Sequence, residues 1–142
     1  MAKTVKDGGI VRQRVPESEK ITINLGFVDL GNIDLLVEEG FYSNRTDFIR
    51  TAIRNQLERH REAVKQTVDR HRLDVGLRRY GRADLEAVKS AGERLHIQVL
   101  GLAIIADDVS SELARDTIAS IRVLGALQVS SAVRAALSDR IR

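Results

Sequence analysis

Three hydrogen-bonding side chains of different chemistry recur at every second position near the start of the chain. Lys20 supplies an ammonium group, Thr22 a hydroxyl and Asn24 an amide. The apolar residues that alternate with them are Ile21, Ile23 and Leu25. A period of two predicts a β-strand with one buried face and one exposed face. The three exposed groups can donate to or accept hydrogen bonds from base edges in a DNA groove.

A single short strand is not stable alone, because its backbone groups lack ladder partners. If two chains pair this strand antiparallel, they form a two-stranded ribbon, and such a ribbon fits the major groove of DNA. The alternative is the edge strand of a mixed domain with an ordinary polar outer face.

Two helical patterns follow the predicted strand. Asp29 is a suitable N-cap for the first helix, and Gly40 can end it in the left-handed conformation. Ser43 is a suitable N-cap for the second helix. A unit of this size buries too little surface as a monomer, so we expect an obligate dimer. The expected dimer core comprises Ile21, Ile23, Leu25, Ile33, Val37, Phe48, Ile49 and Ile53.

Residues 19–60 resemble the ribbon-helix-helix family of DNA-binding regulators, the MetJ, Arc and CopG class. The resemblance rests on the segment from Lys20 to Leu25 and on the segment from Glu39 to Arg50. It implies that Lys20, Thr22 and Asn24 read bases. It also implies that the start of the second helix, formed by Ser43, Asn44 and Arg45, binds a DNA phosphate. The unpaired N–H groups of a helix start suit that role, and Arg45 adds a full positive charge. The alternative is that Ser43 only caps its helix and Arg45 is solvated.

Composition agrees with a DNA-binding protein. The net charge is +3 and the pI is about 9.6. Residues 1–18 form a basic arm that we expect to be flexible. The chain has no cysteine and no apolar run of transmembrane length. We therefore expect a cytoplasmic, nucleoid-associated protein without membrane association.

No spacing predicts a catalytic site. The chain shows no nucleophile–base pair and no glycine-rich phosphate loop. Its three histidines, His60, His71 and His96, lack the compact spacing of metal ligands. We expect no enzyme activity, no cofactor and no bound metal.

The C-terminal part differs in character. Residues 61–83 are highly charged and predict either a helical extension or a linker. Residues 84–142 contain two strand-and-helix patterns offset by about 24 residues, with strands expected at 97–105 and 121–129. A fainter preceding unit has Leu73 and Val75 in the strand positions and Leu85 in the helix. They weakly resemble a leucine-rich-repeat-like solenoid; the alternative is a plain βαβα half-domain. Asp107 or Asp108 should begin one helix, and Ser130 or Ser131 the other. The apolar run predicts buried parallel strands. The expected assembly surface comprises Val99, Leu100, Ile104, Val123 and Leu124.

The sequence thus predicts an α+β protein, with an N-terminal ribbon-helix-helix intertwined dimer and a C-terminal strand-helix repeat. The expected function is sequence-specific binding of double-stranded DNA as a transcriptional repressor. The C-terminal region is expected to join homodimers into tetramers or larger assemblies. Two alternatives remain: an antitoxin-type protein whose C-terminal region binds a protein partner, and a DNA-anchored polymerising scaffold.

Overall fold

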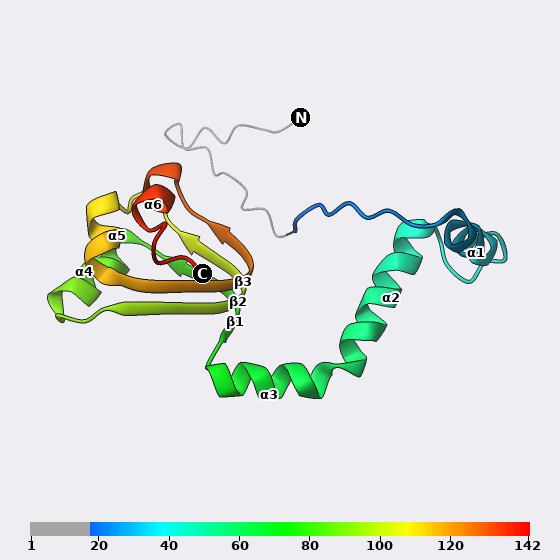
Figure 1. Ribbon diagram of the computed structural model, residues 1–142, viewed down its shortest axis with the longest axis horizontal. Helices are drawn as coiled ribbons and strands as arrows, with labels where there is room; N and C mark the ends of the chain where they lie inside the picture. Colours follow the sequence, from blue (N-terminus) through cyan, green and yellow to red (C-terminus); the bar gives the residue numbers. More distant parts are fainter. Residues whose placement is uncertain (1–17) are drawn as a thin grey trace, which may run out of the picture. The chain divides into compact units, whose positions relative to one another are not determined.

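The computed structural model describes residues 18–142, so almost all of the expected basic arm lies outside the described residues. Helices and strands are mixed, which agrees with the predicted α+β class. The chain divides into a first unit that ends at Arg45 and a second unit, Thr46–Arg142. Figure 1 shows the helices and strands of both units along the chain.

The first unit contains one helix, α1 (Phe27–Glu38), among its described residues. Residues 18–26 have no regular secondary structure in the single chain. The prediction that Asp29 caps α1 is wrong, because Gly26 is the N-cap and Asp29 lies in the first turn. A carboxylate in the first turn still stabilises the helix, since it faces the positive end of the helix dipole.

Gly40 ends α1 as predicted. Its φ of +85° is a left-handed conformation that a side chain disfavours. The Gly40 N–H donates to the Val37 carbonyl oxygen at 3.0 Å, and the Phe41 N–H donates to the Leu36 carbonyl oxygen at 2.9 Å. This pair of bonds is a Schellman motif, which satisfies carbonyl groups at the helix end and turns the chain.

The next two helices are α2 (Arg45–Arg59) and α3 (Arg61–His71). The helix α2 begins two residues after Ser43. Helix α3 ends at His71, and its C-cap is Arg72, whose φ of 52° and ψ of 47° are left-handed. Strand β1 (Asp74–Tyr80) follows directly. The segment 61–83 therefore holds a helix and a strand, and the strand-and-helix region starts at Asp74, not at residue 84.

The second unit continues with alternating helices and strands. The elements are α4 (Arg82–Ser90), β2 (Leu95–Ile105), α5 (Ser111–Thr117), β3 (Ile118–Gln128) and α6 (Ser131–Ala136). The strands form one sheet in the order β1-β2-β3, and both pairs are parallel. This confirms the parallel pairing that the apolar runs predicted.

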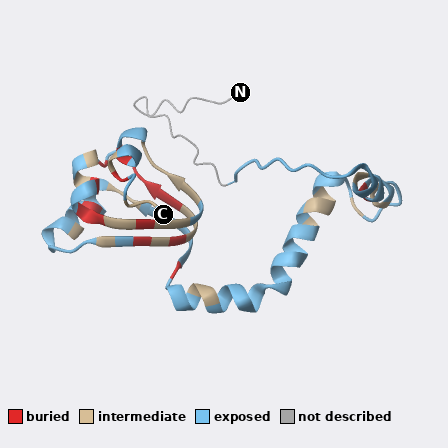
Figure 2. Cartoon of the chain, viewed as in Figure 1, coloured by how far each residue is buried: buried red, intermediate tan, exposed pale blue. Residues whose placement is uncertain are grey.

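A single core lies between the sheet and the helices that follow its strands. Ile97, Val99, Ala103 and Ile105 of β2 are buried, and one residue from each of these three helices joins the same cluster. Those helix residues are Leu85 of α4, Ala114 of α5 and Val133 of α6. Figure 2 shows the buried residues concentrated in this part of the chain, whereas α2 and α3 are mostly exposed. Tertiary packing in the described chain is thus strongest in the C-terminal strand-and-helix region, residues 74–142, called the C-terminal unit below.

The pairs that repeat in the sequence are direct neighbours in the sheet. Ile97 pairs with Ile121, Leu100 with Leu124 and Gly101 with Gly125. The helix starts differ in how well they were predicted. Ser130 caps α6 by accepting a hydrogen bond from the Val133 N–H at 3.2 Å. The expected start of α5 at Asp107 or Asp108 is wrong, because Ser110 caps that helix instead.

Candidate nucleic-acid interface

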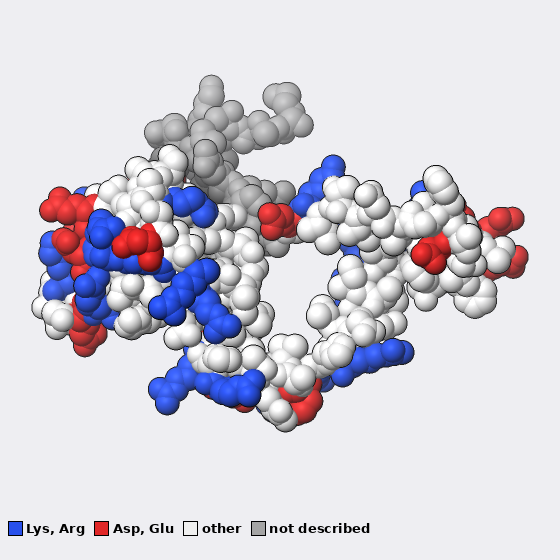
Figure 3. Space-filling view, viewed as in Figure 1, with Lys and Arg blue, Asp and Glu red and all other residues white. Residues whose placement is uncertain are grey.

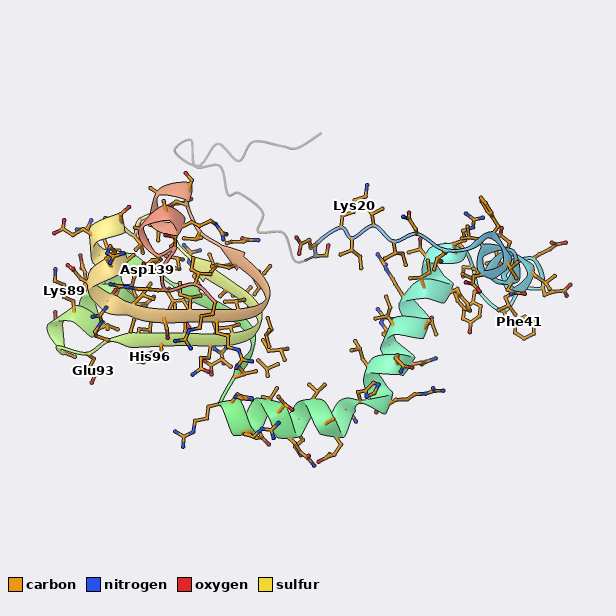
Figure 4. All side chains as sticks on the ribbon, in the orientation of Figure 1. Lys20, Phe41, Lys89, Glu93, His96 and Asp139 are labelled. Carbon is orange, nitrogen blue, oxygen red and sulfur yellow. The ribbon has the colours of Figure 1, made fainter. Side chains whose placement is uncertain are left out.

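The predicted base-reading residues lie on an extended, solvent-exposed segment. Lys20, Thr22 and Asn24 are all exposed in the single chain. Figure 4 shows the Lys20 side chain directed away from the backbone of the segment that precedes α1. These side chains are therefore accessible to a ligand as large as a DNA duplex.

The apolar residues of the same segment are exposed as well. Ile21 is 72% exposed and Ile23 is 58% exposed, and Phe27 at the start of α1 reaches 92%. Several large apolar side chains exposed close together in sequence typify a protein–protein interface. Among the described residues of the first unit, only Ile33 is a buried hydrophobic residue. The unit therefore has almost no core of its own in the single chain.

The remaining predicted dimer-core residues are only partly covered. Val37, Phe48 and Ile49 are half-buried, and Ile53 is exposed. Phe41, in the turn after α1, is also exposed, and Figure 4 shows its side chain at the surface. Phe41 was not predicted as an apolar surface residue, although the sequence has an aromatic residue directly after Gly40.

Arg45 forms a bidentate ion pair with Asp34 of α1. Its Nε donates to Asp34 Oδ1 at 2.7 Å, and its Nη2 donates to Asp34 Oδ2 at 2.8 Å. The two side chains remain about half exposed. The pair joins α1 to the first residue of α2, so Arg45 has a structural role within the unit. Sequence reasoning missed this partner, because the two residues lie on different helices.

The ion pair changes the proton affinity of both groups. The hydrogen bonds from Arg45 lower the pKa of the Asp34 carboxyl below its ordinary value, with a further contribution from the Arg45 charge. The same hydrogen bonds raise the pKa of Arg45. Both groups therefore stay charged near neutral pH, and the pair is broken only in acid.

The start of α2 carries the three residues expected at a phosphate. Ser43 and Asn44 precede the helix, Arg45 is its first residue, and all three are exposed. The start of a helix lies at the positive end of its dipole, which favours an anion there. The guanidinium of Arg45, the first residue of α2, is bound to the Asp34 carboxylate.

The residues predicted for an assembly surface lie in different environments. Val99 is fully buried and Ile104 is 8% exposed, so both belong to the interior of the chain's own C-terminal unit. Leu100 and Val123 are half-buried, and Leu124 is 46% exposed. Only part of the predicted assembly surface is therefore accessible. Val99 is buried because the alternation of side chains along β2 places it on the face of the sheet that the helices cover.

The charged surface of the C-terminal unit is mixed in sign. Figure 3 shows basic and acidic side chains interspersed over this unit. Lys89 of α4 pairs with Asp116 of α5 at 3.1 Å, and Arg115 pairs with Asp139 at 3.2 Å. The first pair connects the successive helices α4 and α5, and the second connects α5 to the residues after α6, so these charges serve contacts within the chain.

Residues 18–142 hold neither a metal-binding cluster nor a membrane-spanning helix. No group of three or more His, Cys, Asp or Glu side chains is placed to hold a metal ion there. Within the same residues, no helix combines the length and apolar character needed to cross a membrane.

A family model extends the resemblance beyond the N-terminal motif. The model of the ribbon-helix-helix transcriptional regulator family matches residues 16–134. The chain belongs to this family. The match covers the exposed segment, α1 and α2, and it continues through β1, β2 and β3 into α6. Ribbon-helix-helix regulators bind DNA as dimers. No curated protein and no solved structure matches the chain.

Family membership gives the exposed segment a context. In this ribbon-helix-helix regulator, the segment with alternating polar and apolar residues stands directly before α1, where the family motif has its ribbon. The sequence resemblance to the family is confirmed, and the matched range is longer than the residues 19–60 that suggested it.

Proposed function

We propose that this regulator binds DNA sequence-specifically as a homodimer. Residues 20–25 of two chains pair antiparallel and enter the major groove as a two-stranded ribbon. Lys20, Thr22 and Asn24 then face the base edges, where Asn can bond bidentately to adenine. The observation that carries this proposal is the alternating segment, whose polar and apolar faces are both exposed in the single chain.

Dimer formation accounts for the apolar face of that segment. Ile21, Ile23 and Leu25 pack against α1 and α2 of both chains in the proposed dimer. Full burial of one such side chain contributes about 1.5–3 kcal/mol. Ile33, Val37, Phe48, Ile49 and Ile53 complete this core.

Phosphate contacts fix the ribbon in the groove. The start of α2, with Ser43, Asn44 and Arg45, binds a DNA phosphate through backbone N–H groups and the guanidinium. Such contacts orient a protein on the duplex without reading its sequence. The bidentate pair with Asp34 holds the Arg45 side chain in place beside the helix start.

The protein acts as a repressor in the cytoplasm, associated with the nucleoid. Its C-terminal unit joins DNA-bound homodimers into tetramers or larger assemblies. Linking dimers raises the effective concentration of each dimer at neighbouring sites, so adjacent operators are occupied cooperatively.

The test is Asn24→Ala in the full chain. Selection from a random duplex library with the unaltered protein first supplies the preferred site. Removal of one bidentate amide interaction should weaken binding to that site by about 1–3 kcal/mol, and affinity for random DNA should change little. The matched control is Asn32→Ala, which removes an exposed amide from α1 and should leave both affinities unchanged.

Two outcomes contradict the proposal. An equal loss of affinity for selected and random DNA in Asn24→Ala would show that this side chain does not read bases. Failure of the library selection to enrich any sequence would show that the protein is not a sequence-specific regulator.

A further inference from the structure

Three glycines lie side by side across the sheet of the C-terminal unit. Gly76 of β1 pairs with Gly101 of β2, and Gly101 pairs with Gly125 of β3. Their φ values are +109°, +137° and +126°, a region that residues with side chains rarely adopt. Together they form a glycine ladder that crosses all three strands.

The glycine ladder has a direction. A Cβ atom on Gly101 would lie 2.3 Å from the carbonyl oxygen of Gly76, and one on Gly125 would lie 2.1 Å from the carbonyl oxygen of Gly101. The carbonyl oxygens of Gly76 and Gly101 therefore occupy the space that a side chain would need on the next strand. This arrangement repeats from β1 to β2 and again from β2 to β3.

The two outer edges of the sheet are complementary by the same geometry. At the β1 edge, no atom lies within 4 Å of the Cβ position of Gly76 in the described chain. At the β3 edge, continuation of the pattern directs the Gly125 carbonyl outward. One edge thus presents a carbonyl, and the other presents a site with room to receive it.

The apolar residues beside the glycine ladder are exposed at both edges. Val75 and Leu77 of β1 are 57% and 52% exposed, and Leu124 of β3 also faces solvent in part. Inside the sheet, Val75 pairs with Leu100, which pairs with Leu124. A further strand at the β3 edge would extend this apolar row by one residue.

The C-terminal residues leave the required stretch of β3 open. Ile141 forms an isolated parallel bridge with Ile121, closed by hydrogen bonds that involve Arg140 and Arg142. In the described residues, this bridge reaches the outer edge of β3 only near Ile121. Asp74, the first residue of β1, pairs with Val99 of β2, and Val99 pairs with Val123 of β3. A β1 strand that continued this register at the β3 edge would therefore begin at Val123, beyond the bridge at Ile121.

We propose that β1 of a second copy adds in parallel to the outer edge of β3, with Gly76 opposite Gly125. The pairing rests on the proposed function only for the role of the C-terminal unit in assembly, and does not depend on DNA binding. Val75 then lies opposite Leu124, and Leu77 lies opposite Ala126. A slip of one residue would place a Cβ atom against the Gly125 carbonyl and exchange the two faces of the strand. The glycine ladder therefore selects both the partner strand and its register.

The interface uses two different edges, so it is heterologous. The joined sheet of two copies still has one open β1 edge and one open β3 edge, so growth is open-ended unless the rotation closes a ring. Exposed edge strands commonly pair with further chains in this way. Homodimers that carry two such sheets are thereby connected into arrays.

The first test measures assembly size by sedimentation velocity across a concentration series. The unaltered protein should form species larger than the homodimer, and Val75→Asp or Leu124→Asp should each abolish them. The matched control is Ala87→Asp, which adds the same charge to an exposed position of α4 and should retain the large species. An unaltered protein that never exceeds a dimer, or large species that persist in both edge variants, would overturn the inference.

The second test captures the register. The chain has no cysteine, so the variant with both Arg79→Cys and Gln128→Cys contains only the introduced thiols. These positions share one register row, because each pairs with Ile104 of β2. Within one sheet they are two strand spacings apart, about 9.6 Å, which is too far for a disulfide. Between copies they become neighbours about 4.8 Å apart, within the range that a disulfide spans.

Mild oxidation should therefore give a ladder of covalent multimers on a non-reducing gel. The matched control carries Arg78→Cys with Gln128→Cys. Position 78 is one residue away from the position that pairs with 128 between copies, so this variant should cross-link far less. Equal cross-linking of the two variants would refute the proposed register. The DNA-binding measurement is separate: Val75→Asp should still bind a single selected site. If the unaltered protein selects no DNA sequence but both edge tests succeed, the proposed function fails and the edge pairing stands.

Discussion

Substitution of Gly101 by alanine tests the glycine ladder inside one chain. The new Cβ atom would lie 2.3 Å from the Gly76 carbonyl oxygen, and both atoms belong to the backbone framework. No side-chain rotation can relieve this overlap, so β1 and β2 must separate locally. The φ of +137° adds strain whatever space is made.

The magnitude follows from these two effects. A side chain in such a backbone conformation costs about 1–3 kcal/mol. Separation of the strands at this point disturbs about two ladder hydrogen bonds, each with a net contribution of about 0.5–1.5 kcal/mol. Gly101→Ala should therefore destabilise the C-terminal unit by about 2–6 kcal/mol, a large part of the usual stability of about 5–15 kcal/mol for a domain.

Gly76→Ala is the matched comparison. Gly76 has a φ of +109°, but no atom lies near its Cβ position in the single chain. Its cost should be limited to backbone strain, about 1–3 kcal/mol. Urea unfolding followed by far-ultraviolet circular dichroism should be run at a concentration below assembly. Equal stability of the two variants would show that the close approach of the carbonyl is not present, and the reasoning would fail.

Three other predictions concern the ion pair, the phosphate site and the core. The pKa of Asp34 is lowered in the folded chain, so the Asp34–Arg45 pair stabilises the fold at pH values above the ordinary aspartate pKa. This stabilisation disappears as the pH falls through the pKa of Asp34 in the folded chain, and Asp34→Asn should remove this acid dependence in a pH series of unfolding curves. Arg45→Ala should weaken binding to all DNA sequences alike and reduce the salt dependence of the binding constant by about one phosphate equivalent for each arginine–phosphate interaction removed. A changed sequence preference with an unaltered salt dependence would contradict phosphate binding by Arg45. Val99→Asp places a charge in a fully buried position and should unfold the C-terminal unit, with disappearance of the sheet's circular dichroism signal; a native signal would contradict the described core.

Local patterns predicted the elements that depend on neighbouring residues. The glycine at the end of α1 follows from the need for a left-handed residue at that point, and Ser130 was one of two serines expected to begin α6. The parallel strands followed from continuous apolar runs, which only a sheet covered by helices can bury. Strand β1 was indicated only faintly, by Leu73 and Val75 in strand positions, because its apolar pattern is short and is followed by two arginines. Its stability comes from pairing with β2.

The sequence by itself determined the family, the alternating segment before α1 and the 24-residue offset of the C-terminal strands, because each depends on residue order along the chain. Only the tertiary structure decided which of these residues are accessible. Val99 and Leu124 have similar apolar character in sequence, yet one is in the core and the other is exposed. The partner of Arg45 and the alignment of the three glycines also depend on distances between elements, and no local pattern encodes those distances.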